Sequence, residues 1–168
     1  MAQGEEAGSV APGAGLRPAR WTSNLGPMSV LLRPLHDCRL YAFVDAAYLH
    51  GREPLALARD LIRGGAGLGQ LRAKGWPRER IAETAAELAP VCRDAGAWFV
   101  VNDHPDLAAA ASAPLAHLGQ EDFFDAGHRQ VSEVAPAGVQ VGLSSHAPAQ
   151  AERAVAAGAA YVAVGPVY

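Results

Sequence analysis

Two basic and two acidic side chains of this sequence have the chemistry needed to hold a metal–phosphate complex. Arg72 and Lys74 carry permanent positive charge and N–H donors that match phosphate oxygens. Asp103 and Asp122 supply hard anionic oxygens, which Mg²⁺ prefers while it bridges substrate phosphates. A metal–diphosphate pair explains why both signs of charge would share a pocket, because the carboxylates hold the metal while the metal and the cations hold the diphosphate. The four residues therefore predict a Mg²⁺-dependent site for a phosphorylated ligand.

The spacing of Gln70, Arg72 and Lys74 supports this interpretation. Alternate residues of a strand point to one face, so these three side chains share a face of the apolar segment 67–74. An unpaired buried charge costs on the order of several kcal/mol. This face is therefore either open to water or met by an anionic ligand.

Each candidate also has a structural explanation when it is taken alone. Asp103 precedes Pro105 and is placed to cap a short helix. Asp122 lies in the first turn of a predicted helix, where the helix dipole favours an acid. Arg72 and Lys74 can form internal salt bridges. Other rim candidates are Ser144 and Ser145, either of which can instead cap the helix after Pro148. The remaining ones are the single histidines His117 and His146, which are more often packing or surface groups than catalysts.

The elements that must position these residues alternate between apolar β-type runs and helical patterns. The first helical pattern begins at Pro54, and the longest one has an apolar stripe from Ile81 to Ala95. Alternation of this kind predicts right-handed βαβ units and a parallel sheet, either open and doubly wound or a (β/α)₈ barrel. No G-x-G-x-x-G motif follows the first strand, so a dinucleotide-binding sheet has no support. The predicted strands are 39–45, 67–72, 97–102, 114–119, 138–144 and 160–165, and the predicted helices cover about 53–63, 77–95, 105–111, 121–136 and 148–157.

Polar residues collect where the predicted strands end. The carboxyl ends of parallel strands converge on one rim, which is where α/β proteins build their sites. The strand starts, in contrast, are mostly Gly, Ala and Pro. The residues at the carboxyl ends are Asp45, Gln70, Arg72, Lys74, Asn102, Asp103, His117, Gln120, Glu121, Asp122, Ser144, Ser145, His146 and Gly165.

Composition argues against several functional classes of protein. The 168 residues are 50% hydrophobic and 18% charged, with a formal charge of −3, which argues against nucleic-acid or anionic-membrane binding. No apolar run could span a membrane and the start is not a secretory signal, so we expect a cytoplasmic protein. Cys38 and Cys92 are expected to be reduced thiols. We expect a disordered tail at 1–35 and one domain at 36–168.

Five segments together resemble the thiamine-phosphate synthase family. They are QLRAK (70–74), VND (101–103), HLGQED (117–122), GLSSH (142–146) and GAAYVAVGPVY (158–168). The resemblance implies a (β/α)₈ TIM barrel of which about six of eight βα units are present. It also implies the condensation of 4-amino-2-methyl-5-hydroxymethylpyrimidine diphosphate with thiazole phosphate, giving thiamine phosphate and diphosphate. The family continues after GPVY with a Pro-Thr-x-Thr-Lys run and two more strands, so we expect a C-terminally incomplete chain.

The resemblance also assigns roles to individual residues. It makes Asp103 and Asp122 the Mg²⁺ ligands and places Ser144 beside the leaving diphosphate. In all, it implies catalytic roles for Ser144, Arg72 and Lys74, and substrate contacts for Gln70, Arg72, Lys74, Asn102, Ser144, His146 and Gly165. Ala73 stands where the family usually has an acid, and it is expected to point away from the rim with little effect.

Two other functions stay open on the sequence. One is a thiazole tautomerase-like isomerase of the same fold, with His146 as the proton shuttle. The other is an inactive or partner-completed partial barrel, whose open edge is covered by another chain. The expected ligands are phosphorylated pyrimidine and thiazole molecules, with no nucleic acid and no membrane, and formation of a homo-oligomer is left open.

Overall fold

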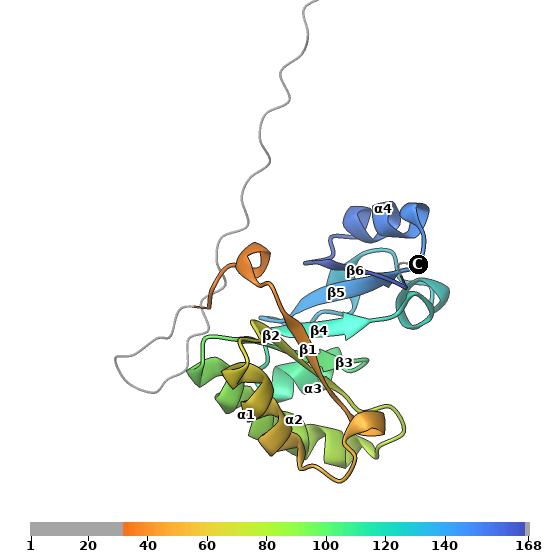
Figure 1. Ribbon diagram of the computed structural model, residues 1–168. Coiled ribbons are helices and arrows are strands. Elements are labelled where there is room, and N and C mark those ends of the chain that lie inside the picture. The colour runs from red at the N-terminus through yellow and green to blue at the C-terminus, as the bar shows by residue number, and fades with distance from the viewer. Residues whose placement is uncertain (1–31, 167–168) are drawn as a thin grey trace, which may run out of the picture.

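A parallel sheet of six strands organises the computed structural model, which describes residues 32–166 (Figure 1). Every predicted strand is present, and each begins one or two residues later than predicted. The strands are β1 (Tyr41–Asp45), β2 (Leu68–Arg72), β3 (Trp98–Asn102), β4 (Leu115–Leu118), β5 (Gln140–Ser145) and β6 (Val162–Val164).

The order of the strands in the sheet is the order of the chain, β1-β2-β3-β4-β5-β6. A doubly wound sheet reverses its order at a switch point, whereas a barrel adds each strand beside the previous one. The six strands form a half-barrel, and β1 and β6 are its two unpaired edges within residues 32–166. The expectation of a parallel α/β fold is confirmed at this level.

Helices connect successive strands. They are α1 (Pro54–Arg63), α2 (Arg78–Asp94), α3 (Pro105–Ala110) and α4 (Pro148–Ala156), with short 3₁₀ helices η1 (Leu35–Asp37), η2 (Ala46–Tyr48) and η4 (Val131–Glu133) and the π-helix η3 (Glu121–Asp125). Proline occupies the first turn of α1, α3 and α4, where its missing N–H has no helical partner to lose.

The single helix expected over 121–136 is wrong. The structure has η3 and η4 instead, separated by a turn. Gly127 adopts a φ of +96° there, which L-residues rarely adopt and which ends helical geometry. The N–H of His128 then bonds to the carbonyl of Phe123, so that the turn closes on the end of η3. Asp122 therefore lies in η3 immediately after β4.

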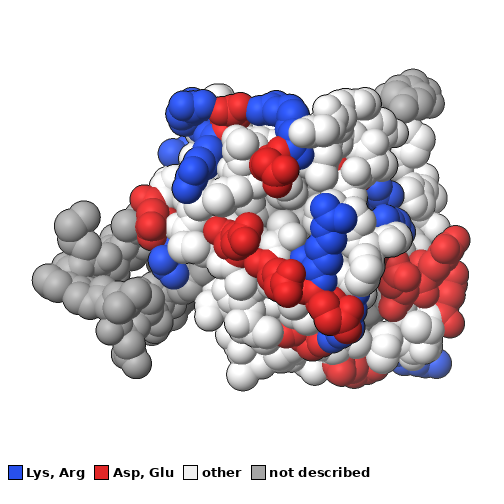
Figure 2. Space-filling model, turned by 90° about the horizontal axis from the view of Figure 1, so that it is seen from below, with Lys and Arg blue, Asp and Glu red and all other residues white. Residues whose placement is uncertain are grey.

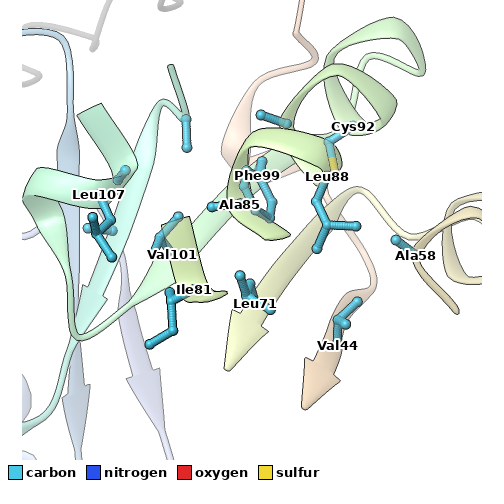
Figure 3. Packing of buried hydrophobic residues seen from close by; sticks show 14 of the residues in the cluster. Val44, Ala58, Leu71, Ile81, Ala85, Leu88, Cys92, Phe99, Val101 and Leu107 are labelled. Carbon is cyan, nitrogen blue, oxygen red and sulfur yellow. The ribbon is translucent and has the colours of Figure 1, made fainter. Parts of the chain in front are cut away.

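The outer face of the sheet packs against α1, α2 and α3 through an apolar core. Leu71 of β2 and Phe99 of β3 are each 1% exposed, and they meet Leu88 of α2, also 1% exposed. Figure 3 shows these side chains converging between the helix and the strands. This core fixes where β1 to β4 end, and so where the rim residues are placed.

A smaller apolar cluster lies on the inner face, toward the start of the strands. Leu68, Trp98 and Leu115 form it together with Leu32, which is 4% exposed. The indole N–H of Trp98 also donates to the Arg33 carbonyl at 2.7 Å. Residues 32–35, which we assigned to the tail, are thus tied to the sheet, while 1–31 lie outside the described residues. No helix between residues 32 and 166 has the length and apolarity to cross a membrane.

Candidate active site

A cavity of about 600 Å³ opens at the carboxyl ends of the strands. Loops after β2, β3, β4 and β5 contribute to it, as parallel strands with a common direction require. Figure 2 shows acidic and basic side chains intermixed over much of one face of the molecule, with acidic side chains gathered at its right-hand edge. The lining residues are Tyr41, Phe43, Gln70, Arg72, Lys74, Asn102, Asp103, His117, Gly119, Gln120, Glu121, Asp122, Asp125, Ser144, His146, Gln150 and Ala163.

The two predicted cations each have a carboxylate neighbour. Arg72 donates to Asp45 at 2.8 Å, and Asp45 also accepts the N–H of Ala47. Lys74 is more exposed, with its Nζ 3.8 Å from Asp103. The internal salt bridges that the sequence left open are therefore present. A guanidinium has five N–H donors, so one bond to Asp45 orients Arg72 and leaves donors for a ligand.

Asp103 and Asp122 face the same cavity. Asp103 has a φ of +63°, an uncommon conformation that turns the chain immediately after β3. Burial raises the pKa of Asp103, the Lys74 ammonium opposes that rise, and the Asp122 charge adds to it. The two carboxylates are thus close enough for the charge of Asp122 to raise the pKa of Asp103, and the neighbouring cations, of which Lys74 has the largest effect, do not cancel the rise.

The carboxylate pair fits a hard divalent cation. Both side chains offer oxygen only, and Mg²⁺ characteristically takes one or two carboxylates plus waters and substrate phosphate. Residues 32–166 contain no group of three or more His, Cys, Asp or Glu side chains arranged around a metal position. Gly119 leaves room for the pair, since a Cβ there would stand 3.0 Å from Asp122 Oδ2.

Six side chains form a continuous hydrogen-bonded row across the inner face below the charged rim. Tyr41 donates to Gln70 Oε1 at 2.5 Å, and Gln70 Nε2 donates to Asn102 Oδ1 at 2.6 Å. The Tyr41 and Tyr161 hydroxyls are 2.7 Å apart. His117 is 3.0 Å from the Tyr161 hydroxyl through Nδ1 and 2.8 Å from Ser144 Oγ through Nε2. We call this row the inner hydrogen-bond chain; its members are Asn102, Gln70, Tyr41, Tyr161, His117 and Ser144.

Three members of the inner hydrogen-bond chain, Gln70, Asn102 and His117, are buried, and the other three are partly exposed. Gln70 is 2% exposed and His117 is 8% exposed. Burial lowers the pKa of His117 to about 4, so that the ring is neutral near pH 7. Gly142 makes the row possible, because a Cβ at that position would stand 2.2 Å from ring carbons of Tyr161. Only glycine at 142 lets the phenol lie against β5.

Gln120 holds the end of β5 in place. Its amide nitrogen donates to the Ser144 carbonyl, and its oxygen accepts from Arg153 of α4 at 2.8 Å. The Arg153 guanidinium in turn lies 3.8 Å from the ring centroid of Phe124. Ser144 is therefore fixed through its backbone by η3 and α4, and through its hydroxyl by His117.

The structure gathers eight of the nine predicted site residues around this cavity: Gln70, Arg72, Lys74, Asn102, Asp103, Asp122, Ser144 and His146. Gly165 is not among the lining residues, and its carbonyl instead contacts Nδ1 of His146. Ala73 points to the opposite face and is buried in the outer core.

Sequence reasoning did not include Tyr41 and Tyr161 among the site residues, and it treated His117 as an ordinary histidine. Alternation along β1 could have identified Tyr41, because Tyr41 and Phe43 lie on the same face of the strand. Phe43 is the register partner of Gln70, so this face is the one that meets the site. Tyr161 falls inside the predicted strand 160–165, but β6 begins only at Val162, and nothing in that apolar run distinguished Tyr161 as a site residue.

Comparison with known proteins relates this arrangement to one family. A family model described as thiamine monophosphate synthase matches residues 40–168. A thiamine-phosphate synthase of Lawsonia intracellularis is 34% identical over 133 residues, 79% of this chain and 59% of its own. One from Methanoculleus marisnigri is 39% identical over 129 residues, 77% of this chain and 60% of its own.

A solved structure agrees with these sequence matches. Thiamine phosphate pyrophosphorylase from Pyrococcus furiosus superimposes with a TM-score of 0.68 at 27% identity, over 78% of this chain and 61% of that one. The chain thus spans about three fifths of the length of the relatives that it matches. Because the family model covers 129 of the 168 residues, from 40 to 168, the chain belongs to the thiamine monophosphate synthase family.

Proposed function

We propose that this chain forms the pyrimidine-diphosphate part of a thiamine-phosphate synthase site. The reaction is the condensation of 4-amino-2-methyl-5-hydroxymethylpyrimidine diphosphate with thiazole phosphate, which gives thiamine phosphate and diphosphate. One observation carries the proposal: two cations and two carboxylates from the ends of three successive strands line one cavity, above a partly buried row of uncharged polar groups. That arrangement matches a ligand with a charged diphosphate at one end and a polar ring at the other.

The side chains of this chain would act mainly by binding and orientation. Arg72 and Lys74 donate to the diphosphate oxygens and stabilise the negative charge that grows as the bond from the pyrimidine methylene to oxygen breaks. The electron pair of that bond leaves with the diphosphate, and the thiazole nitrogen then supplies the pair for the new carbon–nitrogen bond. Gln70, Asn102 and Ser144 hold the ring so that its methylene faces the acceptor.

Asp103 and Asp122 are the side chains that would hold Mg²⁺. Bound there, the ion would neutralise diphosphate charge and so make the diphosphate a better leaving group. The pKa of Asp103, raised by burial and by Asp122, supports this role, because a divalent cation relieves the repulsion between the two acids. Mg²⁺ is thus the proposed cofactor.

The rest of the proposed enzyme extends beyond the half-barrel. We propose that the six units belong to a (β/α)₈ barrel, which the sequential strand order and the superposition on the pyrophosphorylase support. The thiazole phosphate site, and the role of Ser144 in holding the pyrimidine ring, are part of the same proposal. A cytoplasmic location and a homo-oligomer stay predictions of the sequence.

The experiment is an assay for thiamine phosphate formed from the two substrates, with MgCl₂ and with EDTA. We expect formation of thiamine phosphate that depends on Mg²⁺ and falls when Arg72 is changed to Gln. Vigorous turnover in EDTA would contradict the assignment of Asp103 and Asp122 as metal ligands. Binding of the pyrimidine diphosphate by calorimetry covers the case in which this chain binds without turning over.

One observation favours the isomerase as a second candidate. His146 lines the cavity and contacts the Gly165 carbonyl through Nδ1, which leaves Nε2 for a proton shuttle. A tautomerase has no use for the Asp pair, so it should keep its activity in Asp122→Asn, whereas the synthase should lose most of its activity. Asp94→Asn, which changes an exposed acid on α2 paired with Arg93, is the matched control.

The partner-completed partial barrel is tested by the state in solution. Phe43 of β1 and Val164 of β6 are 48% and 64% exposed, so both edge strands present apolar surface. Size-exclusion chromatography with light scattering gives the mass directly. A well-behaved monomer would speak against completion by a second copy.

A further inference from the structure

The inner hydrogen-bond chain has a direction, because each phenol in it carries a single proton. Gln70 sets that direction. Its Nε2 donates to Asn102 Oδ1 at 2.6 Å, so its Oε1 is the atom that meets the Tyr41 hydroxyl at 2.5 Å. A carbonyl oxygen can only accept, and Tyr41 therefore gives its only proton to Gln70. The 2.7 Å bond between the two phenols must then be donated by Tyr161.

Counting the hydroxyl protons also shows which ring nitrogen of His117 carries a proton. Tyr161 has no second proton, so its 3.0 Å bond to His117 must be donated by Nδ1 of the imidazole. His117 is 8% exposed, and its side-chain hydrogen bonds go to two hydroxyls, not to a carboxylate. A buried ring without a counter-ion is neutral. Its Nε2 therefore holds a lone pair and accepts the hydroxyl proton of Ser144 at 2.8 Å.

We propose that Tyr161 is a positioning residue that holds His117 in the tautomer protonated on Nδ1 and thereby makes Ser144 a hydrogen-bond acceptor toward the cavity. The proton of Ser144 points at His117, so its oxygen lone pairs are left for a ligand. At the opposite end, Asn102 Oδ1 is occupied by Gln70, which leaves the Nδ2 donors. The cavity wall therefore selects a ligand with an N–H group near Ser144 and an acceptor near Asn102.

Two further features indicate that the inner hydrogen-bond chain is a specific part of the fold. The His117 and Tyr161 rings stack with centroids 5.6 Å apart and an interplanar angle of 21°. Gly142 leaves the space that the phenol fills, since any Cβ there would overlap its ring. Among residues 32–166, no buried side-chain nitrogen or oxygen lacks a partner, so the row is satisfied as it stands. Reversing the direction of the row would require the side-chain amides of both Gln70 and Asn102 to exchange their nitrogen and oxygen positions.

The test is the tautomer of His117 in the ligand-free protein. Long-range ¹H–¹⁵N spectra of protein labelled at histidine distinguish a protonated from an unprotonated ring nitrogen, and the loss of signals in His117→Gln assigns them. We expect a proton on Nδ1 and none on Nε2. A proton on Nε2 would mean that the row runs the other way, and it would overturn the proposal.

Tyr161→Phe tests the role of the hydroxyl, because it keeps the ring beside Gly142. Without the phenol oxygen as acceptor, Nδ1 of His117 should no longer be the preferred site of the proton. The ring should then shift toward the tautomer protonated on Nε2. Tyr41→Phe should cause the same shift, since Tyr161 would then be free to donate to Nδ1; it serves where Tyr161→Phe does not fold. Tyr48→Phe, which removes an exposed phenol outside the row, is the matched control. An unchanged tautomer in a folded Tyr161→Phe or Tyr41→Phe protein would overturn the positioning role.

A binding measurement extends the test to the ligand, and this arm rests on the proposed function. Titration with the pyrimidine diphosphate and MgCl₂ should show about tenfold weaker binding to Tyr161→Phe, as expected when one buried donor loses its acceptor. Tyr48→Phe should bind as the parent protein does, and parent-like binding by Tyr161→Phe would contradict the role in ligand selection. If the parent protein does not bind this ligand at all, the proposed function fails, while the tautomer measurement still decides the inference.

Discussion

The two faces of the sheet are built from the same strands but have different roles. On β2, Leu71 points outward into the helix-covered core, while Gln70 and Arg72 point inward. On β3, Phe99 and Val101 point outward and Asn102 points inward. Alternation along a strand thus lets one short segment supply both stability and a binding surface. The outer face should tolerate little loss of volume, and the inner face little loss of polarity.

The inner face is itself graded from the start of the strands to their ends. Leu68 and Trp98 fill the first layer, the inner hydrogen-bond chain forms the second, and the charged residues form the rim. On this face charged side chains occur only in the last layer, where water or a ligand can reach them. Variants on each face can test this separation of roles.

Phe99→Ala should lower the free energy of unfolding by about 3–5 kcal/mol, because it empties the centre of the outer core, where Phe99 is 1% exposed. Urea unfolding measures this loss. Binding of the pyrimidine diphosphate to the fraction that stays folded should change little, since Phe99 does not line the cavity. A selective loss of binding at unchanged stability would mean that the two faces are not separate.

His117 should make the inner face sensitive to pH. Burial lowers its pKa from 6.5 to about 4, so above pH 6.5 the ring is neutral in both the folded and the unfolded state. Between pH 6.5 and about 4 only the unfolded chain takes up the proton, and the free energy of unfolding falls as pH falls. The slope is at most about 1.4 kcal/mol per pH unit, and the total is up to about 3 kcal/mol.

His117→Gln should remove this part of the pH dependence in urea unfolding, whereas His36→Gln, which changes an exposed histidine, should keep it. Equal slopes for His117→Gln and the parent protein would show that the ring is not held neutral by the fold.

Asp103→Asn should weaken Mg²⁺-dependent binding of the pyrimidine diphosphate by about 100-fold, or about 2.7 kcal/mol, because it removes one of two proposed metal ligands. The free energy of unfolding at neutral pH should stay level or rise. Burial and Asp122 already raise the pKa of this carboxyl, so that its charge is disfavoured in the fold. Calorimetry and urea unfolding measure the two quantities, and a loss of both together would point to a structural role instead.

Gly119→Ala should have the smallest effect. The added Cβ would stand 3.0 Å from Asp122 Oδ2, so the carboxylate must move by a few tenths of an ångström. We expect about fivefold weaker Mg²⁺-dependent binding and little change in melting temperature. Gly75→Ala, at a position with a φ of +85° but no neighbour within 4 Å of the added Cβ, separates backbone strain from the clash.

The strands were predicted from apolar runs that alternate with helical patterns along the chain. Such runs are easily recognised in a sequence. The gathering of Arg72, Asp103 and Asp122 also followed from sequence, since parallel strands bring their carboxyl ends together. The break near Gly127 did not follow, because apolar residues on both sides imitate one continuous helix. The link from Tyr41 to Tyr161 joins residues 120 apart, and no local pattern encodes such a contact.

The most direct measurement is a crystal structure of the protein with the pyrimidine diphosphate and Mn²⁺ in place of Mg²⁺. The anomalous signal of Mn²⁺ locates the metal without reference to any assumed ligand. We expect one strong peak between Asp103 and Asp122, with the diphosphate within reach of Arg72 and Lys74. A peak away from both carboxylates, with the diphosphate bound outside this cavity, would contradict it.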